Sequence, residues 1–213
     1  VASGIRKKGR LDMAIVYSQK PCHVAGAFTT NVVKAAPVKW DQKIVKESAY
    51  AQAVVVNSGI ANACTGAEGY GYCQETAEKM SEVLGIPTEA VLVGSTGVIG
   101  MQLPMDKITA GVEQLVEVKN ASTEAGTAAA QAIMTTDTCK KEIALQVEID
   151  GVTVTIGGMA KGSGMIMPNM ATMLCFLTSD VKIASNMLKT ALKEVVDETF
   201  NMVSVDGDTS TND

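Results

Sequence analysis

The chain has 213 residues, of which 46% are hydrophobic and 4% aromatic, and its formal net charge is −5. This length can bury the core of one sizeable domain, and the many small apolar residues are typical of a closely packed α/β protein. We identify no Lys/Arg cluster and no apolar segment of membrane-spanning length. We therefore expect a cytoplasmic protein that binds neither nucleic acid nor a membrane.

In the first part of the chain, the sequence predicts two strands, then one helix, then a third strand. Apolar residues over 11–18 predict a strand, and residues 24–30 predict a second strand that pairs with it as a hairpin across a proline-containing turn. A polar helix over 42–48 and a β-branched strand over 53–56 follow. Small residues and asparagines then occupy 57–66. This run is either a plain strand-to-loop turn or the polar rim of a site, and the sequence favours neither interpretation.

The middle of the chain is mainly helical. Apolar residues at helical spacing predict a helix over 71–84 that ends at a glycine, and a short buried strand follows over 91–93. Two helices are predicted next, over 105–118 and 122–134. The second begins with a serine N-cap and has small side chains on every face, so it can pack closely against its neighbours.

The clearest strand signals come after residue 140. Apolar residues alternate over 143–149 and again over 152–156, and Asp150-Gly151 between them is a favoured two-residue turn, so this pattern predicts an antiparallel hairpin. An amphipathic helix is predicted over 185–200. The alternating helices and strands indicate a layered α/β fold, while the hairpin argues against a purely parallel, doubly wound sheet.

The glycine-rich segment 157–174 is the centre of the candidate site. It holds four glycines and Lys161, which we expect to be buried, and it leads into the apolar run 173–177. A short apolar run bounded by Gly, Pro and Asn is typical of a core strand. We interpret the segment as a loop that delivers Thr172 to the first position of a buried strand.

Several common catalytic and metal-binding arrangements do not fit the sequence. His23 is the only histidine and no serine nucleophile elbow accompanies it, so we expect neither a serine–histidine triad nor a zinc site. The glycine-rich segment lacks the spacing of a phosphate-binding loop. The five cysteines show no metal-type spacing and are expected to be reduced and mostly buried, with Cys175 inert inside the apolar run.

One further mechanism needs no histidine. When the peptide bond before a Ser, Thr or Cys is cut, the freed α-amine has a pKa of about 7.7–8.0 and can act as the base for that residue's own side chain. The pair Ala171-Thr172 suits such a cleavage, because a small residue precedes a hydroxyl residue where a loop meets a strand. Ala-Thr pairs are common, however, and an ordinary loop-to-strand junction remains the alternative from these residues alone.

Motifs along the whole chain resemble the ornithine acetyltransferase family, the bifunctional arginine-biosynthesis enzymes that make N-acetylglutamate. Residues 161–166 and 168–174 together resemble the autoprocessing motif of that family, while Met167 between them departs from it. Further motifs follow the order found in the family and lie at residues 28–31, 35–38, 57–59, 61–66, 95–100, 135–137 and 205–213.

The resemblance implies a layered αββα sandwich of the N-terminal-nucleophile hydrolase (Ntn-hydrolase) type. Residues 1–213 would form one catalytic domain, the N-terminal half of a longer precursor, with an α-chain region over 1–171 and the start of a β-chain region over 172–213. Both ends are expected to be cuts in that precursor. The implied partner is the β chain of the same precursor, in an αβ heterotetramer.

The resemblance also implies a reaction. After self-cleavage between Ala171 and Thr172, Thr172 would take the acetyl group from N-acetylornithine and pass it to glutamate through an acetyl-enzyme. Thr96 and Gly97 match the positions of the family's oxyanion hole, which stabilises the negative charge that develops on the acetyl oxygen.

Substrate binding is implied for three residues, Thr135, Lys161 and Thr172. Without the resemblance, Lys161 would be interpreted as a solvated loop charge and Thr135 as a helix terminus. No cofactor is expected, although acetyl-CoA is possible as a substrate. Two alternatives stay open, namely an amidase or aminopeptidase of similar fold and a small-molecule-binding module that uses the Lys161 loop without chemistry.

Overall fold

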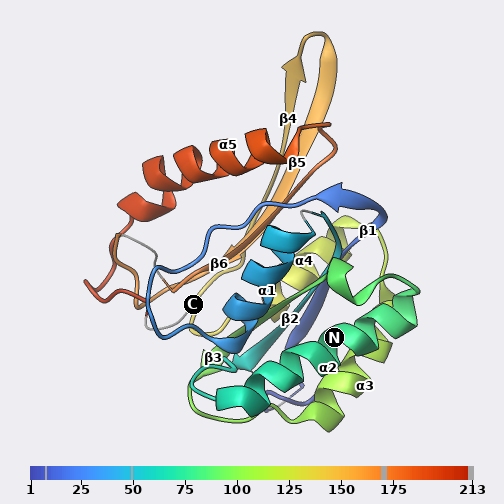
Figure 1. Cartoon of the computed structure of the whole chain (residues 1–213), viewed down its shortest axis with the longest axis vertical. Coiled ribbons are helices and arrows are strands. Elements are labelled where there is room, and N and C mark those ends of the chain that lie inside the picture. Colours follow the sequence, from blue (N-terminus) through green and yellow to red (C-terminus); the bar gives the residue numbers. More distant parts are fainter. Residues whose placement is uncertain (8, 49, 169–171, 211–213) are drawn as a thin grey trace.

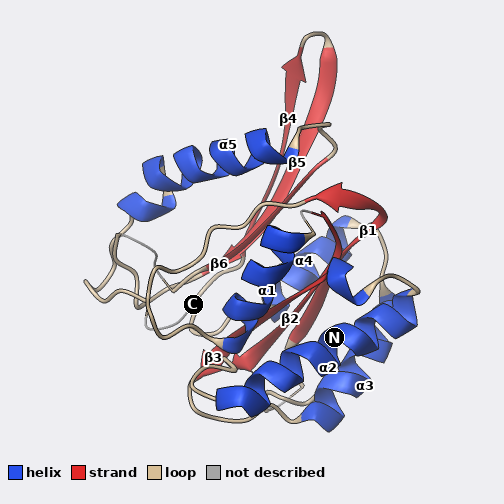
Figure 2. Ribbon diagram, viewed as in Figure 1, coloured by secondary structure: helices blue, strands red, loops and turns tan. Residues whose placement is uncertain are grey.

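The computed structural model describes residues 1–7, 9–48, 50–168 and 172–210, and the strands among them form two three-stranded sheets (Figures 1 and 2). In the first sheet β1 is antiparallel to β2, and β2 is parallel to β3. The second sheet, β4–β5–β6, is antiparallel throughout. The strands are β1 (Met13–His23), β2 (Tyr50–Ile60), β3 (Val91–Val98), β4 (Lys141–Ile149), β5 (Val152–Lys161) and β6 (Leu174–Ser179).

Three helices pack on one face of the first sheet. They are α1 (Ala36–Glu47), α2 (Gly66–Leu84) and α3 (Met105–Val118). Their apolar side chains, including Trp40 and Met80, form one core with Val55 of β2. Successive residues of a strand point to opposite faces of the sheet, so the neighbouring Val56 belongs to a different core.

The opposite face of the first sheet packs on α4 (Thr123–Ala132) and on the second sheet. Val56 meets Ile133 and Met159 in this second core. Phe176 of β6 comes within 3.3 Å of the position that a Cβ atom on Gly94 would occupy, so the two sheets approach closely there. The prediction of stacked, mixed sheets in a layered α/β fold is therefore confirmed.

Several predicted elements agree with the structure. The β4–β5 hairpin turns at Asp150 and Gly151, which have φ angles of 51° and 77° as this kind of turn requires. Helix α3 has the predicted bounds, whereas α1 begins at Ala36 and not at residue 42, because Pro37 is accommodated in its first turn. Of the helices formed by the described residues, none is long and apolar enough to cross a membrane.

The predicted hairpin between residues 11–18 and 24–30 is wrong. A single strand, β1, runs through Pro21, and residues 24–30 are irregular. The pairing of β1 with β2 shifts register between Tyr17 and Cys22. β1 is an edge strand, and an edge strand tolerates a proline at such an irregularity because one row of its N–H groups needs no partner strand.

The predicted burial of the cysteines is also wrong in part. Cys73 in α2 is buried and Cys175 in β6 is half-buried, but the other three are exposed, namely Cys22, Cys64 and Cys139. Cys22 lies on the edge strand, and Cys139 lies in the loop before β4. These thiols lie outside the two cores because the segments that carry them are at the surface.

Helix α5 (Ser185–Glu198) and the β4–β5 hairpin expose much apolar surface. The expected inward face of α5 is only partly covered, since Val196 is buried while Met187 and Val195 are 63% and 53% exposed. The hairpin extends away from the rest of the molecule (Figure 1). Its apolar side chains Ile143, Leu145, Val147, Ile149 and Val152 are between 45% and 62% exposed.

Candidate active site

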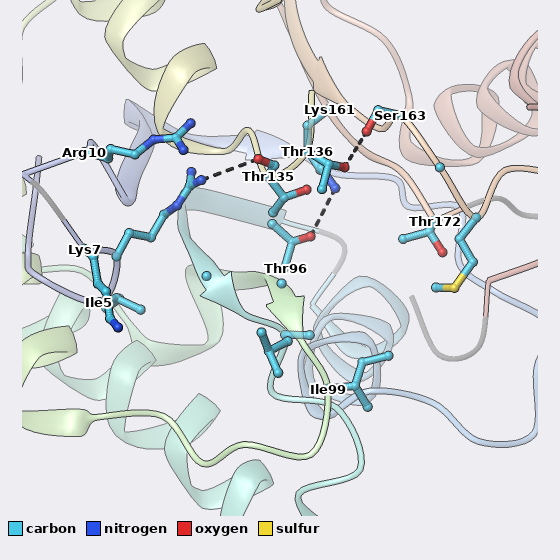
Figure 3. A pocket seen from close by; sticks show the side chains of 17 residues that line it. Ile5, Lys7, Arg10, Thr96, Ile99, Thr135, Thr136, Lys161, Ser163 and Thr172 are labelled. Atoms are coloured by element: carbon cyan, nitrogen blue, oxygen red, sulfur yellow. Dashed lines mark hydrogen bonds between the residues drawn. The ribbon is translucent and has the colours of Figure 1, made fainter. Parts of the chain in front are cut away.

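A pocket of about 720 Å³ brings together site residues from distant parts of the chain. Its walls come from the N-terminal segment, the ends of β2 and β3, the loop after α4 and the glycine-rich segment after β5 (Figure 3). Ala171, on the other side of the predicted cleavage bond, lies outside the described residues. Every other predicted site residue lines this pocket: Thr96, Gly97, Thr135, Lys161 and Thr172.

Thr96 and Gly97 reach the pocket at the end of β3, beside the parallel strand β2. Gly97 pairs with Gly59 and has a φ of 138°, in a region that side-chain-bearing residues rarely adopt. A Cβ atom on Gly97 would lie 2.3 Å from the carbonyl carbon of Gly59. Any side chain at position 97 would therefore push the two strands apart, and this position requires glycine.

Lys161 is a buried residue of the pocket wall. It is 4% exposed at the end of β5, so the expectation that it is buried is confirmed and the alternative of a solvated loop charge is wrong. Its Nζ donates a hydrogen bond to Thr96 Oγ1 at 3.3 Å (Figure 3). Lys161 also pairs with Leu174, the first residue of β6. This register places Thr172, two residues before the strand, close to the Lys161 end of β5.

Thr172 is held through its backbone, and its side chain has no structural partner among the described residues. Its N–H donates to the carbonyl oxygen of Met165 at 2.9 Å. Its hydroxyl oxygen is shielded from solvent and lacks a hydrogen-bond partner in the described part of the chain. Leaving a buried polar atom unpaired costs free energy, and such atoms often serve a function.

The strand after Thr172 differs from the prediction of a buried strand. β6 begins at Leu174, and Leu177 within it is 55% exposed. β6 is the edge strand of the second sheet and pairs with β5 on one side only. Thr172 thus precedes an edge strand and lies in the loop that leads into it.

Asp137 ties three segments of the pocket wall together. Its carboxylate accepts hydrogen bonds from Lys141 Nζ at 2.6 Å and from the backbone N–H groups of Gly162 and Thr135 at 2.8 and 3.2 Å. Burial alone would raise the pKa of Asp137, but these hydrogen bonds outweigh it and lower the pKa to about 2. The charged carboxylate therefore fixes the start of the glycine-rich loop against the loop that carries Thr135.

Sequence analysis missed one wall of the pocket, which is formed by Ile5, Arg6, Lys7 and Arg10. Residues 6–10 include four basic side chains, so the statement that the chain has no Lys/Arg cluster was wrong. The signal was visible in the sequence. Its meaning depends on the fold, because Arg6, Lys7 and Arg10 all line the pocket, with Arg6 half-buried and Lys7 and Arg10 exposed.

The buried Asp12 shapes this N-terminal segment. Its carboxylate accepts hydrogen bonds from the backbone N–H groups of Ser3, Gly4 and Arg6 at 2.6, 3.1 and 3.0 Å. Three N–H donors on one carboxylate fold the segment into a tight loop. This loop places Arg6 in the pocket wall.

The side chain of Arg6 is held at both ends. Its Cγ lies 3.0 Å from the position that a Cβ atom on Gly59 would occupy, and its guanidinium donates to the carbonyl oxygens of Met134 and Thr135 at 2.6 and 3.4 Å. Burial and the nearby charge of Arg10 lower the pKa of Arg6, but an arginine remains charged in proteins. A positive charge is therefore fixed on the pocket wall.

The run 57–66, left open between a turn and a polar rim, forms part of the wall without presenting its asparagines to the pocket. Asn57 donates to Ile60 O at 2.9 Å, and the buried Asn62 donates to a carbonyl of α2 at 2.8 Å. Gly59 and Ala61 line the pocket. The asparagines therefore support the wall from behind.

The residues of the rejected mechanisms are not part of this pocket. His23 is exposed at the end of β1, with its ring nitrogens bonded to Ile183 O and Tyr50 Oη. Burial raises the pKa of the Cys175 thiol, which keeps it protonated and unreactive. Within the described ranges, no group of three or more His, Cys, Asp or Glu side chains is arranged to hold a metal ion.

Two solved structures share the architecture of this chain. The chain matches the arginine biosynthesis bifunctional protein ArgJ from Bacillus halodurans with a TM-score of 0.76 and 44% identity, over 80% of this chain and 88% of that one. It matches ornithine acetyltransferase from Mycobacterium tuberculosis, solved in complex with ornithine, with a TM-score of 0.73 and 43% identity, over 82% of this chain and 90% of that one. The chain therefore has an α/β fold of the Ntn-hydrolase type.

Sequence comparison narrows this class to one family. The model of the ArgJ family matches residues 1–213, and this chain belongs to that family. Relatives named arginine biosynthesis bifunctional protein ArgJ include those from Thermotoga neapolitana, 53% identical over 208 residues, and Clostridium acetobutylicum, 51% identical over 213 residues. These alignments cover 97% and 100% of this chain but 52% of each relative, so the chain spans about half the length of the curated relatives it matches.

Proposed function

We propose that the protein to which this chain belongs transfers the acetyl group of N-acetylornithine to glutamate in arginine biosynthesis. Membership of the ArgJ family supports this reaction, as does the ornithine bound in the solved Mycobacterium tuberculosis relative. The observation that carries the proposal is the pocket itself, in which the Thr172 hydroxyl, without a hydrogen-bond partner among the described residues, lies in one cavity with Lys161, Thr96 and Gly97.

Thr172 is the proposed nucleophile, after cleavage of the bond that joins it to Ala171. Its free α-amine, with a pKa of about 7.7–8.0, accepts the hydroxyl proton as Oγ1 attacks the acetyl carbonyl carbon. The carbon–nitrogen bond then breaks, and ornithine leaves with the proton. The α-amine of glutamate attacks the acetyl-Thr172 ester in the same way, which releases N-acetylglutamate and restores the threonine.

Thr96 and Gly97 are the proposed oxyanion hole. The Thr96 hydroxyl accepts a hydrogen bond from Lys161, so its own hydrogen remains available to donate to a developing oxyanion. The charge of Lys161 also favours negative charge nearby. Thr135 and Lys161 are the proposed contacts to the substrate carboxylate, because both line the pocket and a lysine binds carboxylates as a point charge.

The remaining half of the protein is the proposed partner of this chain. Matches to the curated relatives cover about half of each relative, whereas matches to the solved chains cover 88% and 90% of those chains. This difference supports a longer polypeptide that is divided into two chains, which we propose assemble as an αβ heterotetramer. The exposed hairpin and α5 offer apolar surface for that assembly. A cytoplasmic location and acetyl-CoA as a second acetyl donor stay predictions.

The proposal is tested with the full-length protein and both substrates. Mass spectrometry should detect ornithine and N-acetylglutamate in equal amounts, and two fragments of the protein that meet at the Ala171-Thr172 bond. Thr172→Ala should remain uncut and inactive, while Thr172→Ser, which keeps a hydroxyl, should retain cleavage and measurable transfer. Release of free acetate in place of N-acetylglutamate would identify an amidase, and an active Thr172→Ala variant would refute Thr172 as the nucleophile.

A further inference from the structure

The proposed reaction leaves one end of the pocket unexplained. Four of the described residues that line the pocket are positively charged and none is negatively charged; the four are Arg6, Lys7, Arg10 and Lys161. In Figure 3, Lys7 and Arg10 lie at the end remote from Thr172, and Thr96 and Thr135 lie between the two ends. The acids behind the walls, Asp12 and Asp137, already accept hydrogen bonds from backbone N–H groups.

The side chain of Arg6 lies between this end of the pocket and the reacting centre. Its stem lies against Gly59, and Gly59 in turn lies against Gly97 of the proposed oxyanion hole, so Arg6 is close to the reacting centre. Its guanidinium contacts two backbone carbonyls and, among the described residues, forms no ion pair. An arginine fixed in this way loses little conformational entropy when it binds a carboxylate.

The two proposed substrates differ at the ends of their side chains. Both carry a carboxylate next to the reacting nitrogen, and Lys161, which contacts Thr96 and ends the strand beside Thr172, is placed for that group. Ornithine ends in an ammonium group, whereas glutamate ends in a second carboxylate. A cationic end of the pocket repels the first of these groups and attracts the second.

We propose, on the basis of the function proposed above, that Arg6 binds the side-chain carboxylate of the acceptor glutamate and so determines acceptor specificity. Lys7 and Arg10 add positive charge beyond Arg6, at the end of the pocket remote from Thr172. The side-chain ammonium of the donor must then lie elsewhere, away from these cations. Arg6 thus acts in the second half-reaction and not in the first.

The test separates the two half-reactions in the full-length protein. In Arg6→Gln, kcat/KM for glutamate should fall about 10- to 100-fold, mainly through KM, because one charge-assisted contact is lost. The rate of ornithine release from N-acetylornithine, which reports acetylation, should change less than about threefold. Glutamine, which lacks the second carboxylate, should be a poor acceptor for the wild type, and Arg6→Gln should lose most of this preference for glutamate. Arg6→Lys, which keeps a positive charge, should keep part of the preference for glutamate over glutamine.

Lys107→Ala provides the matched control. Lys107 Nζ donates to Gly4 O at 2.8 Å and so supports the same N-terminal segment, but Lys107 does not line the pocket. This variant should leave both half-reactions unchanged. Equal decreases in the rates of both half-reactions in Arg6→Gln would overturn the proposal. Arg6 would then either support Thr135 or contact the carboxylate that both substrates share.

Calorimetry distinguishes failure of this inference from failure of the proposed function. Binding of glutamate to the processed wild type should be at least about tenfold tighter than binding of glutamine, and this difference should shrink in Arg6→Gln. The measurement needs no turnover, so it remains decisive if the wild type fails to transfer acetyl groups. Unchanged discrimination between glutamate and glutamine in Arg6→Gln would overturn the assignment.

Discussion

The hydroxyl of Thr96 can both accept and donate hydrogen bonds, and the structure shows only the accepting role, toward Lys161. If the hydrogen of this hydroxyl stabilises the oxyanion, Thr96→Val should lower kcat by about 10²–10³, since the variant keeps the shape and loses the donor. Thr96→Ser should stay within about tenfold of the wild type. Steady-state kinetics of acetyl transfer measure both variants. A Thr96→Val enzyme with normal kcat would exclude this hydroxyl from the oxyanion hole.

At the scale of elements, Asp137 joins the loop after α4 to the start of β4 and the end of β5. Its pKa of about 2 is below the value of about 3.9 in an unfolded chain, so its stabilising effect is complete above the unfolded value and is lost as the pH falls from about 4 to 2. Asp137→Asn should be less stable than the wild type at pH 6. The difference in free energy of unfolding between the two proteins should shrink toward pH 2.5.

Asp197 supplies the comparison for this prediction. It pairs with Lys193 at 2.6 Å on the surface of α5, where its side chain is half exposed. Because solvent weakens such a pair, Asp197→Asn should change stability little at any pH. Urea unfolding between pH 2.5 and 6 measures all three proteins. A gap between Asp137→Asn and the wild type that stays constant down to pH 2.5 would contradict the pKa shift.

The secondary-structure elements also show what the local sequence can and cannot predict. The Asp150-Gly151 turn and the glycine-rich loop around Thr172 were predictable because the residues that shape them are neighbours in the chain. Arg6 was missed because its partners Met134 and Thr135 lie about 130 residues away, and no local pattern encodes that contact. The continuation of β1 through Pro21 was missed because a proline indicates a turn unless the strand is known to be at an edge.

At the scale of the whole molecule, the β4–β5 hairpin exposes an apolar side that includes Leu145. If the remaining half of the protein covers it, Leu145→Lys should weaken co-purification of the two halves, because a charge would be buried there. Gln146→Lys is the control, since adjacent strand residues point to opposite faces. Residues 1–213 expressed alone should bind a hydrophobic dye, and the assembled protein should not. Equal assembly of both lysine variants would show that the hairpin is not the interface.

The central claim is that Thr172 carries the acetyl group between the two substrates. The most direct measurement is mass spectrometry of the full-length protein quenched in acid after mixing with N-acetylornithine in the absence of glutamate. We expect a mass increase of one acetyl group on a peptide that begins with Thr172, and its loss when glutamate is added before the quench. An unmodified Thr172 peptide in a protein that still forms N-acetylglutamate would contradict the account.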